Sequence, residues 1–443
     1  MLTTGCGNSY RPVVSAINPV GPAGQPTKYA VAVSSPSAAT PGLVTFVDFS
    51  GDTVLSTPSI LPNPSYFAET ANGVSAYVIN PVGAIDTFGL SNPTGLLTSN
   101  IVETTLPPAS APVSISALSI LGTGTTVFVP QQATSTIAEL SSNGPTLEQV
   151  ISVGANPMYV VGIDGAPRVY AISQNASGAG QVASIESTTL SISATIPVGS
   201  KPVYGVMSAD AKRTFILNKG DATVNVINTF TNALDVTTPL ISLTPAPPLA
   251  ATLGLNPVWA DLSTVTNQLV VLSAGDGVHP GSVSIINTPL CTASTPVTNP
   301  NCSSTNPTDA TGFGTVLATV PVGINPTMVS VLHDGSRAYV ANSLDATGQC
   351  ATGQGSVSVV NLVSGVVTAT ICGTSSAINT NDFPTLLYGH PNTIAATTGN
   401  PTGKVYVTSS DSKFLTVIYT DTDSVVTHVP IQGAGVRVVV TQP

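Results

Sequence analysis

Seven side chains fall at matching places in short Val-rich segments and belong to types that could bind a ligand. Four are aromatic rings near the start of such segments, where they could either fill a core or offer a stacking surface for a sugar or a peptide. Two carboxyl groups and one guanidinium are the charged groups there, and they could bind a ligand or pair with one another. The seven residues are Tyr66, Glu69, Tyr159, Tyr204, Trp259, Asp261 and Arg437.

Catalytic motifs are absent from the chain. There is no GxSxG, GxGxxG, P-loop, HExxH or CxxC pattern. One or two carboxylates beside an arginine make a poor set of oxygen ligands for a central Ca²⁺, and Asp421 and Asp423 have the spacing of an ordinary turn. The histidines fall in loops, at a rim or in an outer strand, and we predict structural roles for them: His279, His333, His390 and His428. We therefore predict no catalytic residue, no metal and no cofactor.

The segments that position these residues repeat along the chain. Each unit opens with a Pro, often preceded by Asn, and continues with a short apolar strand, a turn and three further strands. The opening prolines are separated by 48, 45, 45, 55, 69 and 65 residues, and the longer intervals contain Pro-rich or Cys-containing insertions. About four strands in about 45 residues is the period of a β-propeller blade. The opening residues are Pro64, Pro112, Pro157, Pro202, Pro257, Pro326 and Pro391.

The two ends of the repeat region complement each other. Three strands at 28–34, 43–49 and 53–60 lack a first strand, and one strand at 436–440 follows the last complete unit. Pairing between them closes a ring and removes free sheet edges. We therefore predict a single all-β propeller of eight four-stranded antiparallel blades over residues 27–443. Seven blades is the alternative, because the strand at 84–88 is weak.

Composition supports this fold class and excludes others. Charged residues are 7% of the 443-residue chain, the formal net charge is −10, and apolar residues are 42%. Long helical bundles need many more charged residues, and 11 cations are too few for a nucleic-acid surface. No stretch of about 18 uninterrupted apolar residues is present, so no membrane-spanning helix is expected.

The five cysteines suggest an oxidising compartment. Two pairs each enclose a short insertion, and we predict the disulfides Cys291–Cys302 and Cys350–Cys372. The alternative is a reduced protein with five inert thiols. Cys6 is then the fifth cysteine, outside both predicted pairs. Its context, Met-Leu-Thr-Thr-Gly-Cys-Gly, resembles the end of a bacterial lipoprotein signal, although Thr3 stands where Leu is usual.

This resemblance implies a lipid on Cys6 as the membrane contact of an extracytoplasmic envelope protein. Residues 1–6 would be the remnant of the signal, and the Pro/Gly-rich residues 7–26 would form a tether. The alternative for the tether is a tail that docks wholly on the first blade.

The repeats resemble the YVTN β-propeller repeat. The resemblance is most specific in Tyr339-Val340-Ala341-Asn342 with the following Ser-Val-Ser-Val-Val-Asn strand, and it extends over about residues 27–442. It implies an extracytoplasmic repeat protein but no single activity. We expect a non-enzymatic binding or envelope scaffold whose partner is an unidentified protein or glycan. The alternatives are a lactonase-like enzyme and an electron-transfer protein with a central haem.

Overall fold

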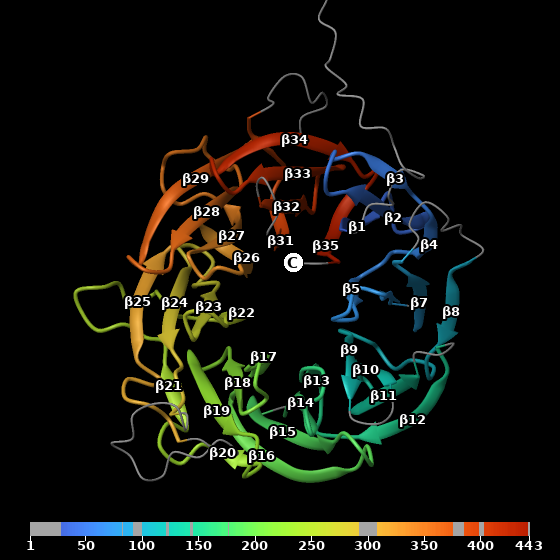
Figure 1. The fold of residues 1–443 in the computed structure, drawn as a ribbon, viewed down its shortest axis with the longest axis vertical. Coiled ribbons are helices and arrows are strands. Elements are labelled where there is room, and N and C mark those ends of the chain that lie inside the picture. The colour runs from blue at the N-terminus through green and yellow to red at the C-terminus, as the bar shows by residue number, and fades with distance from the viewer. Residues whose placement is uncertain are drawn as a thin grey trace, which may run out of the picture.

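The computed structural model describes residues 28–81, 83–91, 100–120, 124–141, 145–175, 177–291, 308–374, 385–397 and 403–441. Within these residues eight antiparallel sheets stand radially around a central axis, as Figure 1 shows. The predicted eight-bladed propeller is thus confirmed, and the seven-bladed alternative is wrong. Among the described residues there is no helix long and apolar enough to cross a membrane.

Each blade has four strand positions, counted outward from the axis, and the blades are numbered 1 to 8 along the chain. The inner strands are β35 (Ala434–Val440), β5 (Tyr66–Glu69), β9 (Ser116–Ile120), β13 (Pro157–Val161), β17 (Pro202–Met207), β22 (Pro257–Ser263), β26 (Ile324–Val331) and β31 (Pro391–Thr397). The second strands are β1 (Tyr29–Ser35), β6 (Ser75–Asn80), β10 (Gly124–Gln131), β14 (Arg168–Gln174), β18 (Arg213–Asn218), β23 (Gln268–Ser273), β27 (Arg337–Leu344) and β32 (Lys404–Ser409).

The outer half of each blade is more variable. The third strands are β2 (Pro41–Asp48), β7 (Ala84–Gly89), β11 (Thr136–Ser141), β15 (Ala179–Glu186), β19 (Thr223–Asn228), β24 (Ser282–Asn287), β28 (Ser356–Asn361) and β33 (Phe414–Tyr419). The fourth position holds β3 (Val54–Ser56) with β4 (Ser59–Pro62), β8 (Val102–Thr105), β12 (Leu147–Ser152), β16 (Ile192–Ser200), β20 (Ala233–Leu234) with β21 (Leu240–Ser242), β25 (Val316–Pro321), β29 (Val366–Thr374) with the parallel β30 (Leu387–Tyr388), and β34 (Ser424–Pro430). The segment 53–60, expected as one strand, is split because Pro58 has no N–H for the ladder.

The Asn-Pro openings have a structural reason. Asn63, Asn156, Asn256 and Asn325 all have φ between 48° and 55°, a left-handed conformation that Asn tolerates better than most residues. In most blades a β-bulge then follows between the opening residue and the residue two places later. Every inner strand therefore begins at one rim, which we call the top face, and ends at the opposite rim, the bottom face.

The C-terminal strand closes the ring as predicted. β35 pairs antiparallel with β1, from Ala30 opposite Val440 to Ser34 opposite Gly435. Blade 1 is therefore built from both ends of the described chain, and Figure 1 shows the red β35 beside the blue β1. Closure leaves no blade at the end of a row with an uncovered face.

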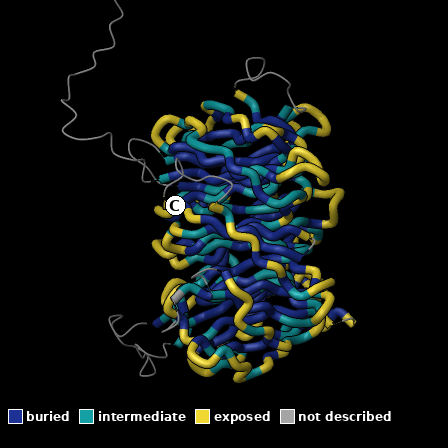
Figure 2. Tube along the Cα trace, turned by 90° about the vertical axis from the view of Figure 1, so that its right-hand side faces the viewer, coloured by how far each residue is buried: buried dark blue, intermediate teal, exposed yellow. Residues whose placement is uncertain are grey.

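The core lies between the blades. Eight clusters of buried hydrophobic residues each draw on two neighbouring blades, as when Phe46 of β2 meets Phe88 of β7 with ring centroids 6.3 Å apart. Figure 2 shows the buried strands and the exposed turns at the rims. Each sheet thus uses both faces in the core, which explains the many Val and Ile residues and the scarcity of charge.

One of the two predicted disulfides is confirmed. Cys350, in the loop between β27 and β28, is bonded to Cys372 of β29, and their Cα atoms are 5.2 Å apart. Cys302, Cys6 and the predicted tether at 7–26 lie outside the described residues. The Cys291–Cys302 bond, the lipidation of Cys6 and the tether therefore stay predictions.

Candidate functional site near the propeller axis

One residue at or near the start of each inner strand takes an equivalent position near the axis, and in most blades a β-bulge precedes it. In β35 the register shift lies between Gly435 and Arg437, so Gly435 takes the place that Pro occupies in other blades. Arg437 is therefore equivalent to Trp259, which follows Pro257 by two residues. The sequence contains both residues, but only the strand register shows that Arg437 and Trp259 occupy equivalent positions. The eight equivalent residues are Arg437, Tyr66, Ser114, Tyr159, Tyr204, Trp259, Met328 and Thr393.

Five of these residues form a connected group, which we call the axial cluster: Tyr66, Tyr159, Tyr204, Trp259 and Arg437. The rings of Tyr159 and Tyr204 have centroids 4.7 Å apart, and Tyr204 stacks on Trp259 at 4.1 Å with an interplanar angle of 18°. The Cζ atom of Arg437 lies 4.5 Å from the Tyr66 ring centroid and 5.0 Å from the Trp259 ring centroid. Because Arg437 is in blade 1 and Trp259 in blade 6, this contact joins blades that are not neighbours.

The electrostatics of the axial cluster favour a positive charge on Arg437 and neutral phenols at Tyr159 and Tyr204. Burial raises the pKa of Tyr159 to about 12 and that of Tyr204 well above its ordinary value. Burial alone would lower the pKa of Arg437, but the neighbouring side chains of Tyr66, Tyr204 and Tyr159, and a hydrogen bond to Tyr66, raise it overall. The Nε atom of Arg437 is buried and has no hydrogen-bond partner among the described residues.

The two carboxyl groups do not pair with Arg437, and the expectation that they could is wrong. Asp261 accepts hydrogen bonds of 2.8 Å from the backbone N–H groups of Leu262 and Val331, and so joins blade 6 to blade 7. The Oε2 atom of Glu69 is buried without a partner among the described residues, and burial raises its pKa to about 8. Glu69 is in blade 2 and Asp261 in blade 6, and burial accounts for the raised pKa of Glu69 without a contribution from Asp261.

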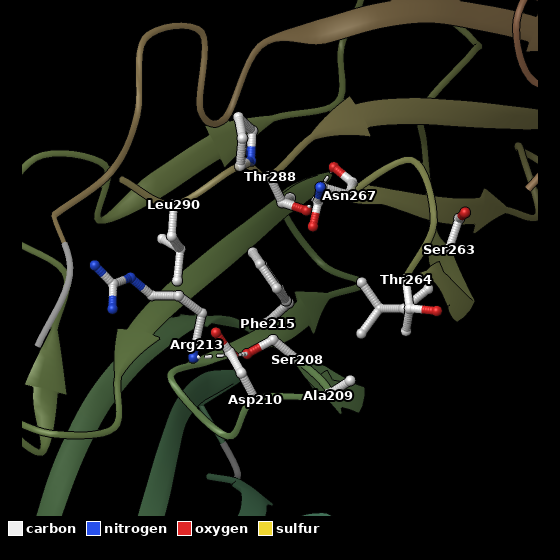
Figure 3. A pocket seen from close by; sticks show the side chains of 12 residues that line it. Ser208, Ala209, Asp210, Arg213, Phe215, Ser263, Thr264, Asn267, Thr288 and Leu290 are labelled. Carbon is white, nitrogen blue, oxygen red and sulfur yellow. Dashed lines mark hydrogen bonds between the residues drawn. The ribbon is translucent and has the colours of Figure 1, made fainter. Parts of the chain in front are cut away.

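Three cavities adjoin the β22–β23 hairpin at the bottom face. One of about 300 Å³ is lined by Tyr159, Tyr204, Met207, Asp261 and Thr264, among others. A second, of about 390 Å³, shares Asp261 and Thr264 and extends past Ser330 to His333. The third, of about 320 Å³, lies between blades 5 and 6, and Figure 3 shows Arg213, Phe215 and Thr264 around it.

Sequence analysis identified Tyr159, Tyr204 and Asp261 as candidates but not the hairpin residues beside them. His333 is exposed at the rim, as expected, yet it also lines the larger cavity. Thr264 and Ser330 were missed because Thr and Ser are frequent throughout the chain. Only their position could have indicated them. Thr264 directly follows the inner strand β22, and Ser330 lies near the end of β26 in the next blade, where it lines the larger cavity.

The turn carboxylates are used in structural contacts. Asp423 accepts hydrogen bonds from both Arg337, at 2.6 Å, and the phenol of Tyr339. His390 contacts Asp411 through Nδ1 at 2.7 Å and the carbonyl of Gly353 through Nε2 at 3.1 Å. Among the described residues no group of three or more His, Cys, Asp or Glu could hold a metal ion.

Comparison with known proteins identifies the fold. No known family profile and no curated protein matches the sequence. Apo AztD from Citrobacter koseri has a similar structure, with a TM-score of 0.56 and 11% identity over 93% of this chain and 97% of that chain. Dihydro-heme d1 dehydrogenase NirN, in complex with DHE, has a TM-score of 0.61 and 13% identity over 92% of this chain and 74% of that chain.

A third similar structure is a candidate 6-phosphogluconolactonase from Bacteroides uniformis. Its TM-score is 0.52 and its identity 14%, over 79% of this chain and 97% of that chain. At such low identity these likenesses show the fold alone, and the resemblance to the YVTN repeat stays a prediction. By its fold, the chain is an eight-bladed β-propeller.

Proposed function

We propose that this protein is a non-enzymatic binding module held outside the cytoplasm, and that its partner binds at the cavities of the bottom face. The observation that carries the proposal is how the charged groups of the inner strands are used. Asp261 is occupied by two backbone N–H groups, and Arg437 lies between aromatic rings. A general base needs a free carboxylate within reach of a substrate proton. Asp261 is not free, and burial raises the pKa of Glu69 to about 8, which keeps its carboxyl group protonated at neutral pH.

The bottom face offers a binding surface. Its three adjoining cavities have volumes between about 300 and 390 Å³, at the lower end of the range for ligand pockets. Their walls combine aromatic rings with hydroxyl groups from Thr264 and Ser330. Such walls suit a segment of a protein or glycan partner, which would present both apolar and hydrogen-bonding groups.

The disulfide and the lipoprotein-like context of Cys6 support the proposed compartment. The Cys350–Cys372 bond supports an oxidising environment. A lipid on Cys6 would hold the protein at a membrane, and twenty tether residues could extend up to about 65 Å. Tyr29 begins β1 at the bottom face, so the partner would bind on the side of the ring that the tether leaves.

Binding at the bottom face is tested by cross-linking in intact cells of the native host. Thr264→Arg places a bulky charge between the cavities and is expected to abolish cross-links that the wild-type protein forms. Thr422→Arg is the matched control, because Thr422 is exposed in a turn of blade 8 away from the cavities. Equal cross-linking by all three proteins would refute the proposed surface. Lactone hydrolysis by the purified protein that disappears in Asp261→Asn would favour the lactonase-like alternative instead.

The anchor is tested separately by replacing Cys6 with Ser behind a complete signal sequence. Release of the propeller into the soluble fraction is the expected result. Unchanged membrane association would contradict the lipid anchor and would leave the binding surface unaffected.

A further inference from the structure

Arg437 is an exception among the arginines of the described chain. Arg168, Arg213 and Arg337 each form an ion pair with a carboxylate, at 3.2, 2.9 and 2.6 Å. No described carboxylate lies within ion-pair distance of Arg437, whose neighbours are aromatic rings and phenol groups. A permanent cation is thus held close to the propeller axis without an anion from the described residues.

The aromatic rings satisfy only part of the guanidinium. Its Cζ atom lies within cation–π distance of the Tyr66 and Trp259 rings, and the Tyr66 side chain also forms a hydrogen bond with the guanidinium. The Nε–H group has no hydrogen-bond partner among the described residues, and the planar fork of a guanidinium matches the oxygens of a carboxylate, phosphate or sulfate group. A partly buried cation without a counter-ion is costly, so an oxyanion that reaches it gains more than it would in water.

The axial cluster is also continuous with a cavity. Tyr159 and Tyr204 belong to the cluster, and their side chains line the bottom-face cavity of about 300 Å³. A ligand body in that cavity would lie against the same stack that holds Arg437 through Trp259. The chain's net charge of −10 repels polyanions at long range, which favours a single anionic group on an otherwise neutral body.

We propose that Arg437 and the rings of Tyr66 and Trp259 form an oxyanion subsite, which takes one carboxylate, phosphate or sulfate group of the ligand. This inference deepens the proposed function, because it names the chemistry of the ligand group that reaches the axis. Arg437 supplies the charge and the donor fork. Tyr66 and Trp259 hold the guanidinium in place and exclude water from its faces.

Trp259 makes the subsite directly observable, because it is the only tryptophan in the chain. Its fluorescence in the full-length protein can be quenched by iodide, an anion, or by caesium, a cation. A unit positive charge at about 4 Å in bulk water enriches a monovalent anion about sixfold and depletes a monovalent cation by the same factor, so we expect iodide to quench about thirtyfold more effectively than caesium. Acrylamide, which is neutral, measures the access of Trp259 independently of charge.

Variants and competitors then assign the effect to Arg437. Arg437→Gln is expected to abolish the preference for iodide, and Arg437→Lys to keep part of it. Arg168→Gln is the matched control and should keep all of it, because Arg168 pairs with Glu186 in the outer part of blade 4. Glucuronate and inorganic phosphate should each protect Trp259 of the wild-type protein from iodide, whereas glucose should not. Protection by only one of the two anions would assign the subsite to carboxylates or to phosphates.

Equal quenching by iodide and caesium in the wild-type protein would overturn the proposal, as would an iodide preference that survives in Arg437→Gln. If Arg437→Gln fails to fold by circular dichroism, the wild-type protection experiment decides alone. This test does not depend on the cellular partner. Equal cross-linking by the wild-type, Thr264→Arg and Thr422→Arg proteins with an intact iodide preference would refute only the binding surface. Cross-linking that Thr264→Arg abolishes, without an iodide preference in the wild-type protein, would refute only the subsite.

Discussion

Replacing Arg213 by methionine is expected to destabilise the propeller strongly and in a pH-dependent way. Arg213 begins β18, and its guanidinium lies 2.9 Å from Asp235 and 3.1 Å from Asp309. The three side chains are 2%, 3% and 5% exposed, so this network is among the most buried ionic groups in the described chain. Methionine keeps the length of the side chain but removes the positive charge, which leaves two buried carboxylates facing each other.

The magnitude follows from the burial. Removing one member of a buried ion pair costs about 3–5 kcal/mol, because the remaining charge is left uncompensated. Unfolding entropy of about 2.1 cal/mol/K per residue amounts to about 0.9 kcal/mol/K for a ring of this size that unfolds as one unit. We therefore expect the Tm to fall by about 3–6 °C at neutral pH.

The pH dependence gives the prediction its sign. Burial opposes ionisation of Asp235, but Arg213 and the N–H groups of Thr238 and Thr237 hold its pKa below the ordinary value. In the wild-type protein this contribution is present above pH 4 and is lost as the pH falls through the lowered pKa. Without Arg213 both carboxyl pKa values rise, so the variant loses stability as the pH increases. The loss of stability of the variant relative to wild type, which we call the deficit, is therefore largest near pH 7.5 and smaller near pH 5.

Differential scanning calorimetry at both pH values measures this difference. Arg168→Met is the control, because the Arg168 and Glu186 side chains are 18% and 24% exposed and a smaller loss is expected. A Tm decrease below about 1 °C, or an equal deficit at pH 5 and pH 7.5, would refute the reasoning from buried charge.

Three further predictions concern other parts of the ring. Cys350→Ser should lower the free energy of unfolding by about 3 kcal/mol, because it opens the loop that ends at Cys372. Peptide mapping without reductant detects the bond, and denaturant unfolding measures the loss. A reduced wild-type protein as stable as the oxidised one would contradict the prediction. Glu69→Gln should raise the free energy of unfolding by about 1–3 kcal/mol at pH 7, because burial raises the pKa of Glu69 to about 8. Above about pH 4.5 the Glu69 carboxyl ionises more readily in the unfolded chain, which disfavours folding of the wild-type protein. The gain should therefore vanish at pH 4. NMR titration should place the pKa of His390 above 6.5, because Asp411 accepts a hydrogen bond from its ring. The stability that this contact contributes is complete below the pKa of the unfolded chain and is lost as the pH rises through the pKa of the folded protein. An unshifted titration would show that the contact is absent in solution.

The sequence by itself determined the architecture, because the features that specify it are local. Asn before Pro marks four of the inner strands, since Asn325 and its equivalents adopt a left-handed conformation that Asn tolerates better than most residues. Alternating Val, Ile and small polar residues specify strands buried on both faces, and the unmatched strand at 436–440 predicts ring closure. The loop enclosed by Cys350 and Cys372 is short enough to suggest their bond without knowledge of the fold.

Only the tertiary structure decided which side chains meet at the axis. Arg437 and Trp259 lie in blades 1 and 6, so their contact depends on the radius of the ring and on the bulge before Arg437. Asp261 had a charge suited to Arg437, but the N–H group of Val331 in the next blade is closer and competes for it. Charge type and spacing specify which partners are chemically suitable, whereas strand register and blade number determine which of them come within a few ångströms, and those distances control electrostatic energies.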